Sequence, residues 1–180
     1  MEKPILYCDC DGVILNTIEI AFQIMRSMGC NMSNKEDIDR YFRQLIDWRD
    51  VFDKTTFIND AIGKIKLLKE SGIFSDIIIL TKLSGGYHEE GLKRDLFKEY
   101  LPDTRIITLQ FGLPKAGVVK AKDNVLIDDE ERNCHNWKDN EGTAILFSED
   151  NKDLKHNVVS DLLDIPNTKG VKKLLKTRNF

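Results

Sequence analysis

Two pairs of acidic residues stand directly after short apolar segments of this sequence. Asp9 and Asp11 follow the run PILYC, and the adjacent Asp128 and Asp129 follow the run NVLI. Carboxylates that converge on one place repel one another, and a bound cation relieves that repulsion. Ligands that are all oxygen atoms favour Mg2+. For either pair alone a structural role, as a helix cap or a turn, is an equal alternative.

The apolar segments are expected to be buried strands, because short apolar runs that stop at polar residues are typical of them. They alternate with helical patterns, which indicates an α/β fold with a parallel, doubly wound sheet. Ligands of such sheets bind beyond the carboxyl ends of the strands, where the strand order reverses. The expected strands are residues 4–8, 77–80, 105–109, 124–127 and 143–147, with Val158 and Val159 as candidates for a closing element.

The stretch from about residue 16 to 55 contains two helical patterns and no strand. The first helix is expected from Thr17 to Gly29. The second follows the capping box Ser33-Asn34-Lys35-Glu36 and continues as one apolar stripe to Trp48. We interpret this stretch as a small helical cap, inserted after the first strand of a single domain that covers residues 1–180. Further helices are expected at residues 58–68, around 92–100 and around 134–137, and the basic tail VKKLLKTR is expected to be a solvated terminal helix.

Composition limits the classes of protein that fit. The chain has 180 residues, 41% of them hydrophobic and 32% charged, which is typical of one globular domain. A net charge of −3 gives no overall attraction to nucleic acid. No apolar run approaches the roughly 20 residues that cross a bilayer, and no signal peptide is evident, so a cytoplasmic location is expected.

The four cysteines are too few for a disulfide framework and are expected to be reduced and buried. A structural zinc site built from Cys8, Cys10, Cys134 and His135 is an alternative. The Cys-x-Cys spacing of the first two disfavours it, because zinc sites usually have two residues between such cysteines.

Candidate phosphate-binding residues lie between the two acidic pairs. Thr81 ends the run IIIL, and its hydroxyl and backbone N–H can hold an anionic oxygen. Before the second acidic pair stand Lys115, Lys120 and Lys122, at least one of which can reach the same edge of the sheet. A lone surface lysine is usually solvated, but a site of carboxylates that binds phosphate needs a fixed positive charge.

The segments YCDCDGVILNT, IIILT and VLIDD, with a lysine before the last, resemble the four signature motifs of the haloacid dehalogenase-like (HAD) phosphohydrolase superfamily. The resemblance implies a Rossmann-like core, Mg2+ and an aspartate nucleophile. KAGVVKAKDNVLIDDEERNCHNWKDNEGTAILF is similar to the closing part of the 5'(3')-deoxyribonucleotidases, which implies a (deoxy)nucleoside monophosphate as substrate. The stretch before Asp128 is longer than in that group, so the lysine of the motif is Lys115 or, as second choice, Lys120. Thr81 is followed by Lys82, where the family commonly has Ser.

The resemblance implies separate roles for the first two aspartates. Asp9 would attack phosphorus and form an aspartyl phosphate. Asp11 would protonate the leaving alkoxide and then deprotonate the attacking water. Gly12 permits the sharp turn that this spacing requires.

The other residues of the motifs would hold the ion and the phosphoryl group. Mg2+ is expected to bind the side chains of Asp9 and Asp128 and the backbone carbonyl of Asp11, with Asp129 as a ligand through water or as an orienting residue. The residues expected to hold the phosphoryl group are Thr81, Lys115 and Gly12.

The leaving group would be selected by the helical cap. Phe22, Tyr41, Phe42 and Trp48 can stack on a nucleobase, although the same helical spacing is typical of a packed core. The expected partner is therefore a small phosphate ester, with neither nucleic acid nor a membrane as a partner. The alternatives are a HAD phosphatase of another small ester, such as a sugar phosphate, and a non-catalytic HAD-like binding module.

Overall fold

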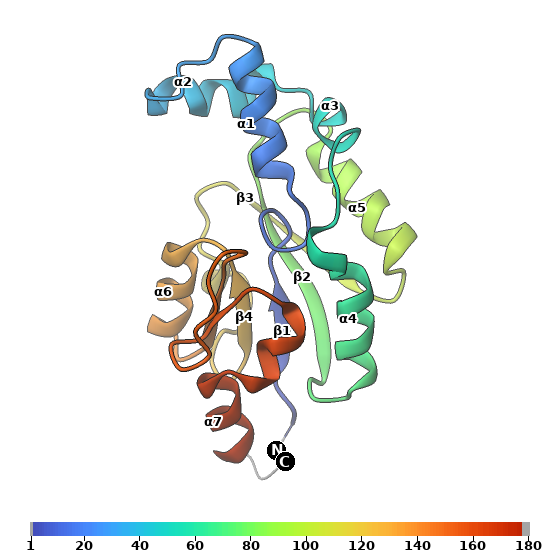
Figure 1. Ribbon diagram of the computed structural model, residues 1–180, viewed down its shortest axis with the longest axis vertical. Coiled ribbons are helices and arrows are strands. Elements are labelled where there is room, and N and C mark those ends of the chain that lie inside the picture. Colours follow the sequence, from blue (N-terminus) through green and yellow to red (C-terminus); the bar gives the residue numbers. More distant parts are fainter. Residues whose placement is uncertain (1, 178–180) are drawn as a thin grey trace.

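The computed structural model describes residues 2–177, and its centre is a six-stranded sheet in which all the neighbouring strands are parallel (Figure 1). The strand order is β3-β2-β1-β4-β5-β6, so the order reverses at β1. This confirms the predicted doubly wound, Rossmann-like sheet. The strands are β1 (Ile5–Cys8), β2 (Asp76–Leu83), β3 (Arg105–Gln110), β4 (Val125–Asp128), β5 (Thr143–Phe147) and β6 (Val158–Val159).

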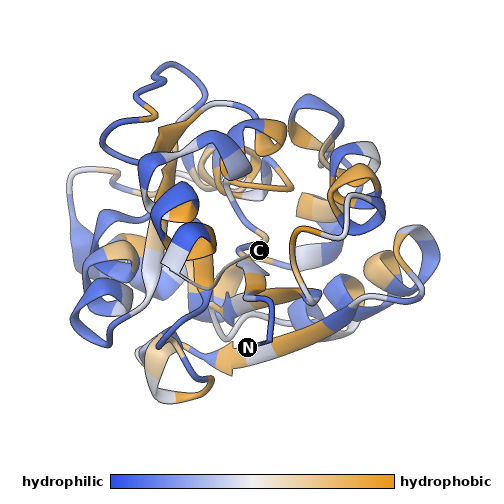
Figure 2. Ribbon diagram, turned by 90° about the horizontal axis from the view of Figure 1, so that it is seen from below, coloured by the Kyte–Doolittle hydropathy of each residue, from blue (hydrophilic) through white to orange (hydrophobic). Residues whose placement is uncertain are grey.

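Helices cover both faces of the sheet. On one face, α4 (Ala61–Glu70), α5 (Glu89–Tyr100) and α7 (Lys169–Thr177) pack on the larger apolar cluster with the 3-10 helix η4 (Leu162–Asn167). On the other face, α6 (Glu131–Asp139) packs through Trp137 on Tyr7. Figure 2 shows the hydrophobic residues gathered along the strands and on the inner sides of the helices. This burial on both faces explains the continuous apolar runs of the central strands.

β2 is longer than the apolar run that predicted it. The strand continues past Leu80 to Leu83, because β3 offers backbone partners as far as the pairing of Leu83 with Gln110. Thr81, expected at the strand end, therefore lies within the strand.

A separate group of helices lies beyond the carboxyl ends of the strands, at the top of Figure 1. It contains α1 (Thr17–Ser27), α2 (Lys35–Arg40), the π-helical turn η1 (Tyr41–Leu45) and α3 (Trp48–Phe52). These elements have an apolar cluster of their own, centred on Met25, Ile46 and Trp48. The chain then returns to the sheet through the short 3-10 helix η2 (Ile58–Asp60).

The prediction of one helix that starts at Ser33 and ends at Trp48 is wrong in two respects. The cap is Asn34, whose side chain accepts from the N–H groups of Glu36 and Asp37. The helix also breaks at Ile46, which has extended backbone. The Asp47 side chain accepts from the N–H of Arg49, and such a local bond competes with continuation of the helix and starts α3.

The four cysteines are free and buried, as predicted. Cys8 and Cys10 belong to the cluster on one face of the sheet and Cys134 to the cluster on the other, so the alternative zinc site does not form. Burial raises the pKa values of Cys8 and Cys134 to about 12. Because the thiolate is the reactive and metal-binding form, these thiols are inert packing groups.

The basic tail forms α7, whose Val171 is buried against the sheet while its lysines face outward. Arg178, the last residue of the predicted tail helix, lies outside the described residues. Within residues 2–177, none of the helices has the length and apolar character that crossing a bilayer requires.

Candidate active site

The two acidic pairs meet at the point where the strand order reverses. Asp9 directly follows β1 and Asp128 is the last residue of β4, the neighbouring strand. Cys8 is aligned with Ile127, and the N–H of Asp9 donates to the Ile127 carbonyl at 3.0 Å. The register of two parallel strands therefore places both carboxylates side by side, at the edge where ligands of such sheets bind.

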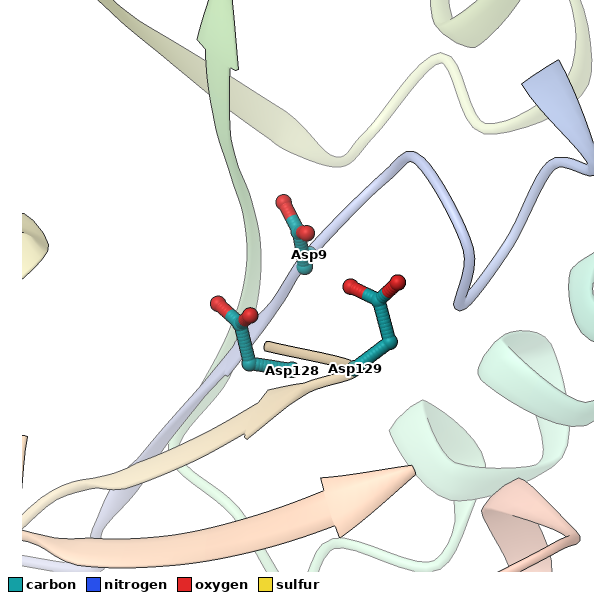
Figure 3. Close-up of side chains that lie close together, drawn as sticks. All are labelled: Asp9, Asp128 and Asp129. Atoms are coloured by element: carbon teal, nitrogen blue, oxygen red, sulfur yellow. The ribbon is translucent and has the colours of Figure 1, made fainter. Parts of the chain in front are cut away.

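Three carboxylates form a compact cluster at this edge. One oxygen each of Asp9, Asp128 and Asp129 lies within 4.8 Å of the others (Figure 3). Asp9 is 7% exposed and Asp128 is fully buried, while Asp129 is open to the cleft described below. A cluster of three oxygen ligands with one open side fits a hard cation such as Mg2+.

Lys115 is the cation that the structure places in this cluster. Its Nζ lies 2.6 Å from Asp9 Oδ1 and 2.6 Å from Asp128 Oδ2, and its side chain is 2% exposed. It reaches the site from the short 3-10 helix η3 (Lys115–Gly117). Lys120, the alternative, lines a separate hollow with Lys3 and Asn124, and Lys122 pairs with Glu141 at 2.9 Å. Of the three predicted lysines, Lys115 is therefore the one at this edge.

The charges of the cluster are incompletely balanced. Burial raises the pKa of Asp9 to about 8 against the opposing effect of Lys115. The neighbouring protein partly shields the carboxyl group of Asp129 from solvent, and this desolvation raises its pKa to about 7. The charge of Asp128 is the next largest cause. Burial would lower the pKa of Lys115, but Asp9 and Asp128 outweigh it and the net shift is upward. More positive charge is needed before Asp9 and Asp129 are both ionised at neutral pH, and a divalent cation would supply it.

Asn133 is a site residue that the sequence analysis did not identify. Its Nδ2 donates to Asp128 Oδ1 at 2.9 Å and to Oδ2 at 3.1 Å, and the N–H of Glu130 donates to Oδ1 at 3.0 Å. The Asn133 Oδ1 in turn accepts from Lys82. The first turn of α6 therefore fixes the orientation of Asp128. The feature of the sequence that could have indicated Asn133 is its position five residues after Asp128, at the start of a helix.

Gly12 forms the turn after Asp11 and lies against Asp129. Its φ of +77° is in the left-handed region, and its N–H donates to the Leu15 carbonyl at 2.8 Å. A Cβ built on Gly12 would lie 2.1 Å from Asp129 Oδ2. The backbone angle therefore favours glycine, and a larger residue here would displace the Asp129 carboxylate.

Gly12→Ala is expected to raise the Mg2+ dissociation constant about tenfold, because Asp129 must move away from the added methyl group. Isothermal titration calorimetry measures this change. Gly29→Ala is the matched control, since Gly29 has a φ of +85° and an added Cβ meets nothing within 4 Å. Both variants are expected to lose about 1 kcal/mol of unfolding free energy from backbone strain. Unchanged Mg2+ affinity in Gly12→Ala, or an equal loss in Gly29→Ala, would contradict this reading of Gly12.

Asp11 lies apart from the carboxylate cluster and has its own partners. Its Oδ1 accepts from the Thr17 hydroxyl at 2.6 Å. Its Oδ2 accepts from Lys93 Nζ at 2.6 Å and from the Thr81 hydroxyl at 3.3 Å. Thr81 is fully buried, and it contacts Asp11 while the following Lys82 lines the cleft. The sequence analysis did not identify Lys93, because it lies in a different element from every motif.

A cleft of about 310 Å³ opens above the acidic groups, between the sheet edge and the helical group. Phe42 and Trp48, two of the four aromatic residues predicted to bind substrate, are among the residues that line it. Phe22 packs edge-on against Phe42, at 5.6 Å between ring centres, on the side of the helical group. Tyr41 is buried within that group, and its hydroxyl donates to the Met28 carbonyl at 3.0 Å. Of the four predicted aromatic residues, Phe42 lines the cleft, Trp48 reaches it from within the apolar cluster with 1% of its surface exposed, and Phe22 and Tyr41 pack in the helical group.

The far wall of the cleft contains residues that the sequence analysis did not identify. Phe111, in the loop after β3, is 58% exposed and lines the cleft. The guanidinium of Arg43, from η1, lies 4.5 Å from the centre of the Phe111 ring and also lines the cleft. This cation–π contact joins the helical group to the sheet loop across the rim.

No protein-family model and no curated protein sequence matches this chain. Among solved structures, it is similar to a HAD-superfamily hydrolase from Ehrlichia chaffeensis, with 15% identity, a TM-score of 0.51 and coverage of 97% of this chain and 99% of the other. A subfamily IA HAD hydrolase from Geobacter sulfurreducens has 13% identity, a TM-score of 0.58 and coverage of 92% and 98%. The HAD hydrolase YfnB from Bacillus subtilis, solved bound to magnesium, has 13% identity, a TM-score of 0.58 and coverage of 93% and 98%.

The protein therefore has the fold of the HAD-superfamily hydrolases, as the resemblance of its motifs predicted. The acidic cluster lies at the strand edge where α/β folds of this kind bind their ligands. The narrower resemblance to deoxyribonucleotidases stays a prediction.

Proposed function

We propose that this protein is a Mg2+-dependent phosphomonoester hydrolase that forms an aspartyl phosphate on Asp9 and acts on (deoxy)nucleoside monophosphates. The observation that carries the proposal is the placement of Asp9 in one cluster with Asp128 and Asp129, with Lys115 bridging Asp9 and Asp128, at the base of a cleft lined by aromatic residues. The fold adds support, because solved structures that this chain resembles are described as HAD-superfamily hydrolases.

In the proposed reaction, a carboxylate oxygen of Asp9 forms a bond to phosphorus as the ester P–O bond breaks. Asp11 gives a proton to the departing alkoxide oxygen. Asp11 then takes a proton from water, whose oxygen attacks phosphorus and breaks the bond to Asp9. Inorganic phosphate leaves, and the Asp9 carboxylate is restored.

Lys115 and the turn at Gly12 would hold the phosphoryl oxygens, and the buried Thr81 would join them only if its hydroxyl left Asp11. Lys115 and Mg2+ together would keep Asp9 ionised. Mg2+ would be held by the side chains of Asp9 and Asp128 and the backbone carbonyl of Asp11, with Asp129 acting directly or through water. When bound, it supplies positive charge that offsets the charge on the phosphoryl oxygens.

The helical group formed by α1, α2, η1 and α3 would act as a cap that selects the leaving group. Phe42 and Phe111, with the largely buried Trp48, line the cleft with aromatic rings, which suit a planar nucleobase better than a sugar. A volume of about 310 Å³ is at the lower end for ligand pockets, which suits a small ester.

A substrate panel tests this proposal. Phosphate release is measured with Mg2+ and with EDTA for 5'- and 3'-(deoxy)nucleoside monophosphates and for sugar phosphates. We expect release only with the divalent ion, and a kcat/KM at least about tenfold higher for the nucleotides, because base stacking contributes about 1–3 kcal/mol. A preference for sugar phosphates would support the alternative phosphatase. If none of the esters releases phosphate, the remaining alternative is a non-catalytic HAD-like binding module.

A further inference from the structure

Lys93 is a buried cation that the proposed reaction does not use. It lies on α5, and its side chain has no exposed surface. Its Nζ is 2.6 Å from Asp11 Oδ2, 2.8 Å from Glu89 Oε1, 3.2 Å from the Thr81 hydroxyl and 3.2 Å from the Lys82 carbonyl. A charge is buried at such a place only when partners compensate the loss of water, so this arrangement is closely fixed.

The second partner of Lys93 connects it to the wall of the cleft. Glu89 is 2% exposed, and its Oε2 accepts from both the N–H and the hydroxyl of Ser84 at 2.7 Å. The indole N–H of Trp48 donates to the same Ser84 hydroxyl at 3.1 Å. Lys93 Nζ also lies 5.4 Å from the centre of the Trp48 ring. A continuous set of contacts thus joins Asp11 to a side chain that lines the cleft.

Both oxygens of Asp11 are held from opposite sides. Thr17, at the start of α1, donates to Oδ1, and Lys93 donates to Oδ2. The Asp11 side chain is 13% exposed, so solvent has little part in orienting it. Proton transfer to a leaving group requires a donor oxygen within about 3 Å of the reacting atom, and two fixed contacts restrict the carboxyl to one orientation.

We propose that Lys93 is a positioning residue for Asp11. It holds the Asp11 carboxyl in the orientation that proton exchange with the ester oxygen requires. The contacts through Glu89 and Ser84 connect Lys93 to Trp48, in the wall against which the leaving group would bind. This inference rests on the proposed function. It predicts that Lys93 matters most for esters whose leaving group needs a proton.

The leaving group distinguishes positioning from a merely structural role. A nucleoside alkoxide is a poor leaving group and depends on general acid catalysis. p-Nitrophenolate is a good leaving group and departs without a proton. Because kcat/KM includes the step in which the ester bond breaks, a misplaced acid lowers this parameter for the nucleotide and leaves it nearly unchanged for the aryl ester.

The experiment compares Lys93→Met in the full chain with Lys98→Met, a control at an exposed lysine of the same helix. For Lys93→Met we expect a kcat/KM about 100-fold lower with a nucleoside monophosphate, and within about threefold of the original with p-nitrophenyl phosphate. Lys98→Met is expected to match the original protein with both. Equal losses with both esters in Lys93→Met would overturn the inference and leave the proposed function standing.

Glu89→Gln keeps the test decisive if Lys93→Met does not fold. The substitution preserves the shape of the side chain and leaves Lys93 paired with Asp11. It replaces the ion pair between Lys93 and residue 89 with a weaker contact to a neutral amide. We expect a smaller loss with the same selectivity for the nucleotide, and an unselective loss would contradict the proposal. If the original protein hydrolyses neither ester, the proposed function fails, and the inference fails with it.

Discussion

Asp9→Asn is expected to lower kcat by at least about 10⁴-fold, because an amide cannot form the phosphoryl bond and removal of a nucleophile is among the most damaging changes to an enzyme. The fold should stay intact. Lys115 keeps Asp128 as a partner at 2.6 Å, so the unfolding free energy should remain within about 1 kcal/mol of the original. Phosphate release and urea unfolding measure the two effects.

Asp139→Asn is the matched control for that variant, since it makes the same chemical change at an exposed position of α6. It should retain full activity. Asp11→Asn should also slow turnover, but by removing the proton donor rather than the nucleophile, and a phosphoenzyme can then accumulate. Normal turnover in Asp9→Asn would remove the proposed nucleophile.

Lys115→Met is expected to affect both stability and catalysis. It would leave Asp9 and the fully buried Asp128 without the ammonium that lies 2.6 Å from each, and the loss of one partner of a buried ion pair costs about 3–5 kcal/mol. Mg2+ should restore part of this loss, because it supplies positive charge to the same carboxylates. We also expect kcat to fall about 10²- to 10³-fold, as when a donor to a developing oxyanion is removed.

Lys120→Met is the control for this substitution. Lys120 is exposed and lines a hollow away from the acidic cluster, so its removal should change neither stability nor kcat. Thermal unfolding with and without Mg2+, together with phosphate release, compares the two variants. If Lys120→Met lost activity while Lys115→Met kept it, the assignment of the motif lysine would be wrong.

The sequence was sufficient to predict the sheet and its acidic edge, for a physical reason. Each central strand is buried on both faces and therefore has a continuous apolar run, and in a parallel sheet the residues that follow such runs share one edge. Asp9 and Asp128 are adjacent because β1 and β4 are neighbours in register. The residue pattern alone left three lysines as candidates, the family resemblance favoured Lys115, and the structure places Lys115 at the acidic cluster.

The parts that could not be predicted depend on contacts between distant segments or on local competition. Lys93 is 82 residues from Asp11, and nothing in the pattern of α5 shows that it faces a carboxylate. The helix breaks at Ile46 despite a continuous apolar stripe, and the side chain of Asp47 caps the next helix. The helical spacing of the aromatic residues in that stripe favours a core over a cleft, and the structure contains both cases: Tyr41 is packed inside, whereas Phe42 lines the cleft.

The central claim is that Asp9 accepts the phosphoryl group beside a divalent ion that it shares with Asp128. A crystal structure of the protein with Mg2+ and beryllium fluoride, a mimic of the phosphoryl group, tests it most directly. We expect the fluoroberyllate on an Asp9 oxygen, with Mg2+ in contact with Asp9 and Asp128. An adduct on another residue, or an ion bound away from these two carboxylates, would contradict the account.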